Sequence, residues 1–207
     1  MTSGRGHGAA TPNIVNVGYD ATNCYVLNAA RASLLVDAGW PSTLPDLRYA
    51  MKRTDVDLGD IRYLLCTHYH PDHAGLAQEL KALGVTLVVL ENQYQGIEAL
   101  RTYMKPEHHY HPITRQGNLD LESIASRAFL LGLGIQGEIL LTPGHSDDSV
   151  SLVLDGGLAF TGDLPPPGFT VDPDHPVRKS WGLLRAHNVH TAYPGHGPAR
   201  HLDPRLD

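Results

Sequence analysis

The chain has 207 residues, of which 42% are hydrophobic, and 16 Lys and Arg against 22 Asp and Glu give a formal charge of −6 at pH 7. Charged residues make up only 18% of the chain, and it contains 21 Gly and 15 Pro, which excludes a coiled coil, collagen and an extended disordered chain. The length fits one globular domain with its own core. We expect a single domain over residues 1–207, with 1–13 as a flexible N-terminus.

The sequence gives little support for a membrane span, a secretion signal or nucleic-acid binding. No apolar run approaches the roughly 18 residues of a membrane span, and residues 1–13 lack the hydrophobic core of a secretion signal. No basic stripe suits a phosphate backbone. Cys24 and Cys66 each lie in an apolar run, which favours buried thiols and a reducing cytoplasm. We therefore expect a cytoplasmic protein with a small-molecule substrate and leave its oligomeric state open.

Short apolar runs bounded by turns predict strands along the chain. These runs are 14–17, 23–27, 33–37, 61–67, 86–90, 139–142, 150–154, 158–161 and 190–193. Apolar residues at helical spacing predict helices around 44–51, 76–83 and 121–128. Strands come first, then alternate with helices, and then return as a hairpin, which predicts a mixed sheet or two sheets covered by helices.

Histidine is unusually frequent, with 13 residues, and imidazole is the commonest metal ligand in proteins. Four side chains that can bind metals, His68, His70, Asp72 and His73, directly follow the predicted strand 61–67. They cannot all reach one ion. In an irregular loop, however, His68 and His70 can face one metal while Asp72 and His73 face another.

Three further residues lie at the ends of other predicted strands, within turns that contain Gly or Pro: His145, Asp163 and His196. Loops that follow buried strands are where rigid scaffolds commonly hold functional residues. Together with the first loop they supply five imidazoles and two carboxylates. That set suffices for two three-residue metal sites that share one bridging carboxylate.

In this order, these residues resemble the signature of the metallo-β-lactamase superfamily, T-H-x-H-x-D-H followed by a lone His, a lone Asp and a final His. The segments 23–27 and 36–39 also resemble the family, and the resemblance extends from Ile14 to Pro198. It implies an α/β fold, a four-layer αββα sandwich with a dinuclear site at one edge between two sheets. It also implies that His68, His70 and His145 hold one zinc ion, that Asp72, His73 and His196 hold the other, and that Asp163 bridges them.

The resemblance implies a dinuclear zinc-dependent hydrolase, in which a metal-bridging hydroxide attacks a small carboxyl-type substrate such as an ester, thioester or lactone. Asp72 would be the catalytic residue that orients this hydroxide and passes its proton onward. An aspartate at position 163 resembles the glyoxalase II, lactonase and esterase branches and is unlike true β-lactamases. The ligand pattern leaves open iron or manganese as the metal, a mononuclear-iron persulfide dioxygenase, a phosphodiesterase, and a non-catalytic metal-binding protein.

A few residues outside the ligand set are further candidates. Asp37, which ends a predicted strand, is either a turn former or a group that orients the His-rich loop. His109 and Tyr110 lie in the stretch 103–115, which is either a solvated surface cluster or a flap over the site. Phe169 lies in the Pro-rich loop 164–176, which we expect to form a wall at the metal edge. We predict that Phe169, His109 and Tyr110 contact the substrate.

Overall fold

The computed structural model describes residues 12–202. Its strands are β1 (Asn13–Asn16), β2 (Tyr25–Asn28), β3 (Ser33–Val36), β4 (Ile61–Leu65), β5 (Thr86–Leu90), β6 (Leu119–Leu121), β7 (Gly137–Leu141), β8 (Val150–Leu154), β9 (Leu158–Gly162), β10 (Thr191–Pro194) and β11 (Arg200–His201). Its α-helices are α1 (Leu44–Arg53), α2 (Pro71–Ala74), α3 (Ala77–Ala82), α4 (Tyr94–Tyr103), α5 (Ser126–Leu133) and α6 (Pro176–Ala186). Short 3₁₀ helices are η1 (Leu58–Asp60), η2 (Pro106–His108) and η3 (Ser123–Ala125). Of the N-terminus expected to be flexible, 1–11 lie outside the described residues, and Asn13 begins β1.

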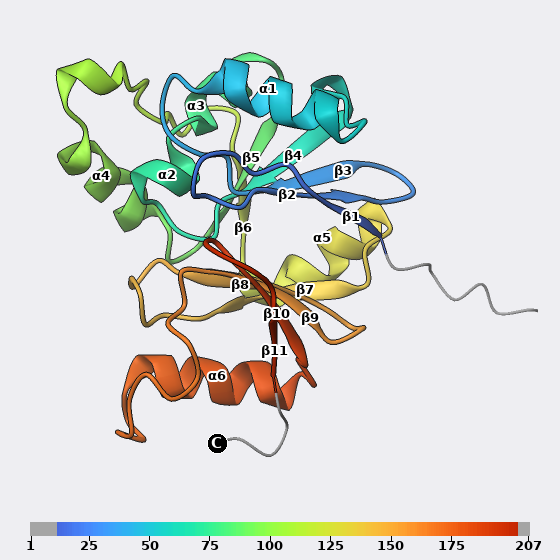
Figure 1. The fold of residues 1–207 in the computed structure, drawn as a ribbon, viewed down its shortest axis with the longest axis vertical. Helices are drawn as coiled ribbons and strands as arrows, with labels where there is room; N and C mark the ends of the chain where they lie inside the picture. The colour runs from blue at the N-terminus through green and yellow to red at the C-terminus, as the bar shows by residue number, and fades with distance from the viewer. Residues whose placement is uncertain (1–11, 203–207) are drawn as a thin grey trace, which may run out of the picture.

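The strands form two sheets, in the orders β1-β2-β3-β4-β5-β6 and β11-β10-β9-β8-β7. The first sheet is antiparallel from β1 to β3 and parallel from β3 to β6. In the second sheet only β9 and β10 are parallel neighbours. Figure 1 shows α1 and α3 over the first sheet and α6 over the far side of the second. This four-layer arrangement confirms the predicted αββα sandwich.

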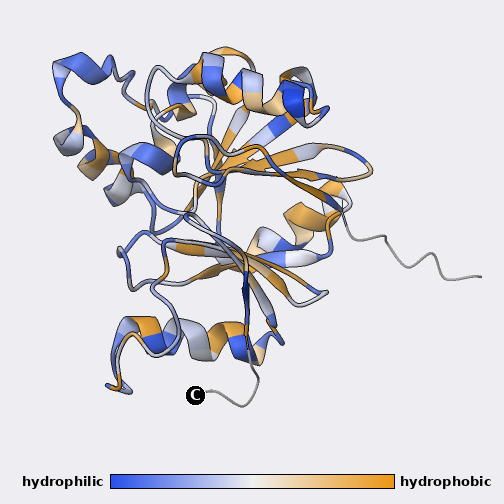
Figure 2. Cartoon of the chain, viewed as in Figure 1, coloured by the Kyte–Doolittle hydropathy of each residue, from blue (hydrophilic) through white to orange (hydrophobic). Residues whose placement is uncertain are grey.

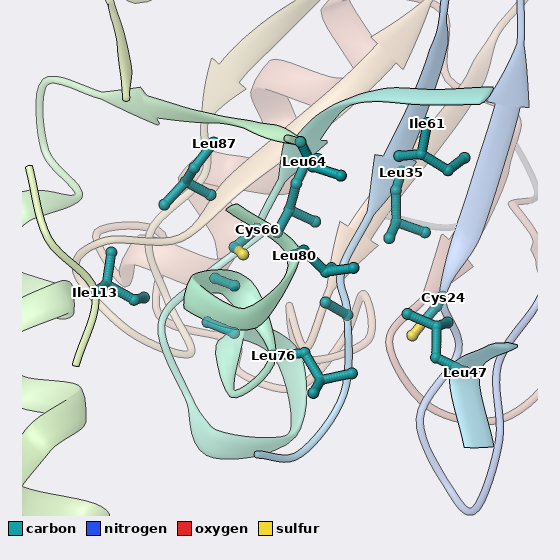
Figure 3. Close-up of a cluster of buried hydrophobic side chains, with 14 of the residues drawn as sticks. Cys24, Leu35, Leu47, Ile61, Leu64, Cys66, Leu76, Leu80, Leu87 and Ile113 are labelled. Atoms are coloured by element: carbon teal, nitrogen blue, oxygen red, sulfur yellow. The ribbon is translucent and has the colours of Figure 1, made fainter. Parts of the chain in front are cut away.

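The outer face of the first sheet packs against its helices through a cluster of buried side chains (Figure 3). Leu64 of β4, Leu47 of α1 and Leu80 of α3 belong to this cluster and are fully buried. Burying one such leucine contributes about 1.5–3 kcal/mol relative to leaving it exposed. Cys24 and Cys66 lie in the same cluster as free thiols, as predicted, and burial raises the pKa of both.

Two further apolar layers complete the sandwich. Between the sheets, Leu65 of β4 and Leu152 of β8 belong to one cluster, which Leu130 of α5 also joins. Below the second sheet, Trp181 of α6 packs in a cluster with Ala159 of β9. Figure 2 shows the strands mostly hydrophobic and the helices mixed. This is the pattern expected when sheets are buried on both faces and each helix has one buried and one exposed face. The strand ends that carry the candidate ligands are therefore anchored in a rigid core.

The nine expected strands all form, with boundaries that shift by up to about two residues. The expected helix around 121–128 is partly wrong, because Leu121 ends β6 and α5 begins only at Ser126. Strands β6 and β11 were not predicted, since three and two residues are too few to show a period. None of the described helices is long and apolar enough to cross a bilayer.

Candidate metal centre

The His-rich loop connects β4 to α2 at the edge of the first sheet. β4 ends in the buried residues Leu64 and Leu65, and Pro71 occupies the start of α2, where its fixed φ and missing N–H cost nothing. The carbonyl of His70 accepts hydrogen bonds from the backbone N–H groups of His73 and Ala74. This tight turn places ligand candidates from both the loop and the helix on one small surface.

Three imidazoles converge in a first group. Nδ1 of His70 lies 3.1 Å from Nε2 of His68 and 3.0 Å from Nε2 of His145. His145 comes from the loop between β7 and β8, so this group joins the two sheets. The three donor atoms lie within 4.8 Å of one another.

A second group contains Asp72, His73 and His196. Oδ2 of Asp72 lies 3.1 Å from Nε2 of His196 and 3.4 Å from Nε2 of His73. His196 follows β10, so this group too takes residues from both sheets. Its donor atoms also lie within 4.8 Å of one another.

Asp163, which follows β9, lies between the two groups. Its Oδ1 is 3.4 Å from Nε2 of His73. Its Oδ2 is 3.4 Å from Nε2 of His196 and 3.7 Å from Nε2 of His145. One carboxylate therefore faces members of both groups, as a bridging ligand would.

The donor set fits divalent metal ions. Nε2 of His73 is buried and has no hydrogen-bond partner among the described residues, although a buried imidazole nitrogen normally has one. Imidazole and carboxylate are common zinc ligands, and two donors each about 2.0–2.1 Å from a tetrahedral zinc lie about 3.4 Å apart. Two of the donor separations in each group, given above, are close to that value. A metal ion would give Nε2 of His73 the bonding partner that no hydrogen bond supplies.

Two cavities flank the centre. One, of about 230 Å³, is lined by His145, Gly162, Asp163, Leu164, Pro165, Pro166, Pro194, His196 and Arg200. The other, of about 250 Å³, is lined by Tyr69, His70, Asn92, Gln95, Gly96, Ala99, Tyr103, Ser146, Asp147 and Asp148. Both cavities are bordered by candidate ligands, so a small molecule can reach the centre from either side.

Comparison with protein families gives a match over residues 17–196 to the metallo-beta-lactamase superfamily. The chain belongs to this superfamily. Among curated proteins, it is 27% identical over 187 residues to a lactamase-like protein of Pestalotiopsis microspora, covering 87% of this chain and 50% of that protein. It is 28% identical over 154 residues to an atrochrysone carboxyl ACP thioesterase of Passalora fulva, covering 70% of this chain and 38% of that one. The chain thus spans about half the length, or less, of these relatives.

Solved structures of the metallo-beta-lactamase superfamily share the fold. A family protein of Thermus thermophilus superposes with a TM-score of 0.70 at 21% identity, covering 93% of this chain and 75% of that one. BJP-1, a subclass B3 metallo-beta-lactamase of Bradyrhizobium japonicum, gives a TM-score of 0.67 at 22% identity over 90% of this chain and 75% of its own. At these identities the likeness establishes the sandwich and no particular substrate.

The superfamily site of this chain holds its carboxylates ionised. Burial would raise the pKa of Asp72, but the interaction with His73 outweighs it and lowers the pKa to about 2. Burial would also raise the pKa of Asp163, and again His73 reverses the effect. Burial would lower the pKa of His73, but the charge of Asp37 together with the contacts to Asp163 and Asp72 outweighs burial and raises it. Without a metal, the carboxylates thus favour a protonated His73. The surroundings of this side chain therefore stabilise a positive charge.

His68 behaves in the opposite way. It is 1% exposed, and burial together with the neighbouring imidazoles lowers its pKa. Its Nδ1 lies 3.2 Å from Oγ1 of Thr67, which leaves Nε2 facing the first group. A neutral imidazole is the form that binds metals.

Asp37 contacts both the His-rich loop and one of the candidate ligands, and its role in orienting them stays a prediction. Its Oδ2 lies 2.9 Å from Nδ1 of His73, and its Oδ1 accepts a 2.7 Å hydrogen bond from the backbone N–H of Thr67. The Thr67 hydroxyl donates to the same carboxylate. Asp37 is 2% exposed, so a single buried carboxylate holds both the His-rich loop and the ring of His73.

Two positions near the centre require glycine, because the backbone there lies very close to other side chains. A Cβ on Gly162, where φ is +51°, would lie 2.3 Å from Oγ1 of Thr67. A Cβ on Gly195 would lie 2.5 Å from Cε1 of His73 and 2.6 Å from Oδ1 of Asp163. The loops after β9 and β10 therefore come within van der Waals distance of the ligands only because they lack side chains there.

The loop between β1 and β2 supports the His196 side. Nδ1 of His196 lies 2.7 Å from the carbonyl of Ala21, and the side chain of Asn23 donates to the carbonyls of Pro194 and Gly197. Figure 1 shows this early loop beside the loop that follows β10. The hydroxyl of Thr22 also donates to Oδ2 of Asp72 at 3.4 Å. Nothing local in the sequence marks Ala21, because its carbonyl and not its side chain makes the contact.

The predicted substrate residues are more scattered. His109 is exposed, in left-handed backbone conformation, and Tyr110 packs against the outer core. From the same stretch, Tyr103 comes closest to the centre, with its ring 5.4 Å from the ring of His70. Phe169 lies against His175 and borders a separate small pocket on α6. Leu164 and the first prolines of its loop do line the cavity next to the ligands. Contact of Phe169, His109 or Tyr110 with a substrate stays a prediction.

Asp148 is a site residue that the sequence pattern did not predict. Its buried carboxylate accepts a 2.7 Å hydrogen bond from the backbone N–H of Tyr69, between two ligand candidates. Gln93 adds a bond from its side chain to the carbonyl of Cys66. The only signal was the acidic pair that follows His145 in the sequence, which looks like an ordinary exposed turn.

Proposed function

We propose that this chain is a dinuclear zinc-dependent hydrolase of a small carboxyl-type substrate, and that a thioester is the first class to test, ahead of esters and lactones. The observation that carries the proposal is the pair of three-donor groups with Asp163 between them, together with a buried nitrogen on His73 that has no hydrogen-bond partner among the described residues. Membership in the metallo-beta-lactamase superfamily supports hydrolysis. The relative from Passalora fulva, which is named as a thioesterase, supports the substrate class.

The residues of the two groups define which side chains would hold the metals. His68, His70 and His145 would hold one ion, Asp72, His73 and His196 the other, and Asp163 would contact both. Bound zinc ions supply a water of lowered pKa and polarise a carbonyl group. Asp37 and Thr67 keep His73 and His68 in place, so the centre would change little as it loads.

Asp72 is the residue best placed to handle a proton. Its pKa of about 2 keeps it ionised at neutral pH, so Oδ2 accepts a hydrogen bond rather than donating one. The Thr22 hydroxyl and Nε2 of His196 both contact that oxygen and would orient it. The carboxylate would orient the attacking water and receive its proton.

Access and exclusion of water come from the loop after β9. Leu164, Pro165 and Pro166 border the cavity that also contains Asp163 and His196. Leu164 is buried, and prolines hold a loop with little loss of chain entropy on folding. This wall would seat an apolar part of the substrate beside the centre.

Metal analysis combined with turnover tests the proposal. The purified protein should hold two zinc ions per chain and hydrolyse phenyl thioacetate, and chelation followed by zinc should remove and then restore both properties. Phenyl acetate and a γ-lactone under the same conditions rank the substrate classes. Asp163→Asn should reduce metal content and turnover together, whereas Asp60→Asn, an exposed acid in η1, should change neither.

Other outcomes identify the alternatives. One iron per chain, with oxygen uptake on glutathione persulfide, would overturn the hydrolase in favour of a dioxygenase. Turnover of bis(p-nitrophenyl) phosphate without any thioester, ester or lactone hydrolysis would favour a phosphodiesterase. Two tightly held zinc ions with no turnover of any of these compounds would favour a metal-binding protein.

A further inference from the structure

Arg200 is a positively charged residue that lines the cavity beside the candidate ligands. It lies four residues after His196 on the edge strand β11, opposite Ala192 of β10. The cavity of about 230 Å³ that Arg200 lines also contains His145, Asp163 and His196. Among the described residues that line this cavity, Arg200 is the one lysine or arginine.

The guanidinium of Arg200 is available for a ligand. Within residues 12–202 it has no ion pair and no side-chain hydrogen bond, and the residue as a whole is half-buried. Two other arginines of the chain, by contrast, are engaged: Arg127 pairs with Asp155 and Glu138, and Arg178 donates to the carbonyl of Val171. A guanidinium carries five N–H donors, so an unengaged one beside a cavity offers a ready site for an anion.

The surroundings favour a single negative charge. Leu164, Pro165 and Pro166 give the cavity an apolar wall, which strengthens electrostatic attraction near it. In the described part of the chain, the carboxylate of Asp163 does not pair with Arg200 and faces the imidazoles instead. One guanidinium matches one carboxylate in both charge and fork geometry, whereas a phosphate group would bring nearly two charges to a single cation.

We propose that Arg200 binds a carboxylate of the substrate and thereby positions the scissile carbonyl at the metal centre. The substrate class is then an ester or thioester that carries a free carboxylate within a few bonds of its carbonyl carbon. Arg200 is a specificity-determining residue, because it selects the anionic substrate over a neutral one of the same size. The inference rests on the proposed function, since it assumes a metal ion that holds the reacting end.

Matched thiols test this inference without a known substrate. A thiolate binds zinc, so 3-mercaptopropionate and 3-mercaptopropionamide differ only in the group offered to Arg200. Calorimetric Kd values on the zinc-loaded protein should favour the carboxylate about tenfold over the amide, as one charge-assisted hydrogen-bonded pair provides. Arg200→Gln should reduce that preference to about twofold or less, and Arg200→Lys should retain an intermediate preference, because it keeps the charge without the fork.

The control and the contrary outcomes keep this idea separate from the proposed function. Arg62→Gln removes the same charge from an exposed position on β4 and should keep the wild-type preference. Zinc content should be equal in all four proteins. A wild-type protein that binds both thiols equally, or an Arg200→Gln variant that keeps the preference, would overturn the role of Arg200 and leave the metal centre intact. Tighter binding of 2-mercaptoethyl phosphate than of the carboxylate, lost in Arg200→Gln, would replace the carboxylate by a phosphate. A protein that holds no metal would overturn the proposed function and this inference with it.

Discussion

The candidate metal centre has a buried side and an open side, and the protein supports them differently. On the buried side, His68 and His73 are 1% and 0% exposed, and Thr67 and Asp37 contact their second ring nitrogens. On the open side, the side chains of His145 and His196 are 29% and 40% exposed. His196 has one backbone carbonyl as support, from the loop between β1 and β2.

The two sides therefore differ in what positions their ligands. Hydrogen bonds of the metal-free protein already hold the buried ligands, so the fold itself fixes the positions of these side chains. Open ligands face the cavity and depend more on the ion itself. The buried side should therefore govern stability and affinity for metal, and the open side should govern access and exchange.

Replacing Asp37 by Ala removes the carboxylate that supports the buried side and should have the largest effect on stability and metal affinity. The N–H and hydroxyl of Thr67 and Nδ1 of His73 would lose their acceptor in a buried place. We expect unfolding free energy to fall by about 2–4 kcal/mol and metal affinity to fall about 10- to 100-fold. Urea unfolding and metal content measure the two, with Asp60→Ala as an exposed control. Wild-type metal affinity in Asp37→Ala would end the argument that the buried side governs it.

Replacing Asp163 by Ala tests whether the two sides share a ligand. Its oxygens face His73 on one side and His145 and His196 on the other, so both metals should weaken together. His196→Ala should instead deplete one ion preferentially, because His196 belongs to one group. Stoichiometry by mass spectrometry of the native protein distinguishes the two patterns. Two tightly bound ions in Asp163→Ala would show that the carboxylate does not bridge.

Replacing Gly195 by Ala tests the contact between the loop after β10 and the buried side of the centre. The new methyl group would press on His73 and Asp163 together, which we expect to cost about 1–3 kcal/mol of stability. Gly182→Ala is the matched control, because a Cβ there meets nothing within 4 Å on an exposed face of α6 and should be neutral or slightly stabilising. Equal thermal melting shifts in the two variants would mean that the loop after β10 yields easily.

The smallest expected effect concerns acid stability of the metal-free protein. The pKa of Asp72 is about 2, below its ordinary value of 3.8, so the ionised carboxylate stabilises the fold above about pH 4. This contribution disappears as the pH falls through 2. Chelated wild-type protein should therefore lose stability more steeply between pH 4 and pH 2 than chelated Asp72→Asn, by urea unfolding at each pH. Parallel curves would mean that the charge of His73 does not stabilise Asp72.

Much of the fold and of the candidate site was predictable from local pattern. Strands such as 86–90 and 150–154 are apolar runs with clear ends, and their predicted limits match β5 and β8. The donors of the His-rich loop lie close in sequence, so their proximity follows from a single turn. The helix α6 also carries a signal, since Val177, Trp181 and Leu184 have helical spacing, but it follows directly on a run of prolines that favours a loop.

The remaining features depend on contacts between distant segments. Asp148 reaches the N–H of Tyr69 across 79 positions, and Arg200 borders the cavity because β11 pairs with β10 in one particular register. A strand of two residues has no period that could show such a register in advance. Phe169 illustrates the same limit, because membership in a loop near Asp163 does not fix which pocket a side chain enters.

The contact between Ala21 and His196 also bears on the order of folding. It spans 175 positions, and the two bonds from Asn23 to the segment around His196 span almost as many. Closing so long a loop carries a large entropic cost and is slow compared with forming the turn that carries His68 and His70. The first group, His68, His70 and His145, can form once the chain has folded as far as His145. The second group also requires His196, so it can form only when nearly the whole chain has folded. We therefore expect the two halves of the centre to become competent for metal at different times during folding, with the His196 half last.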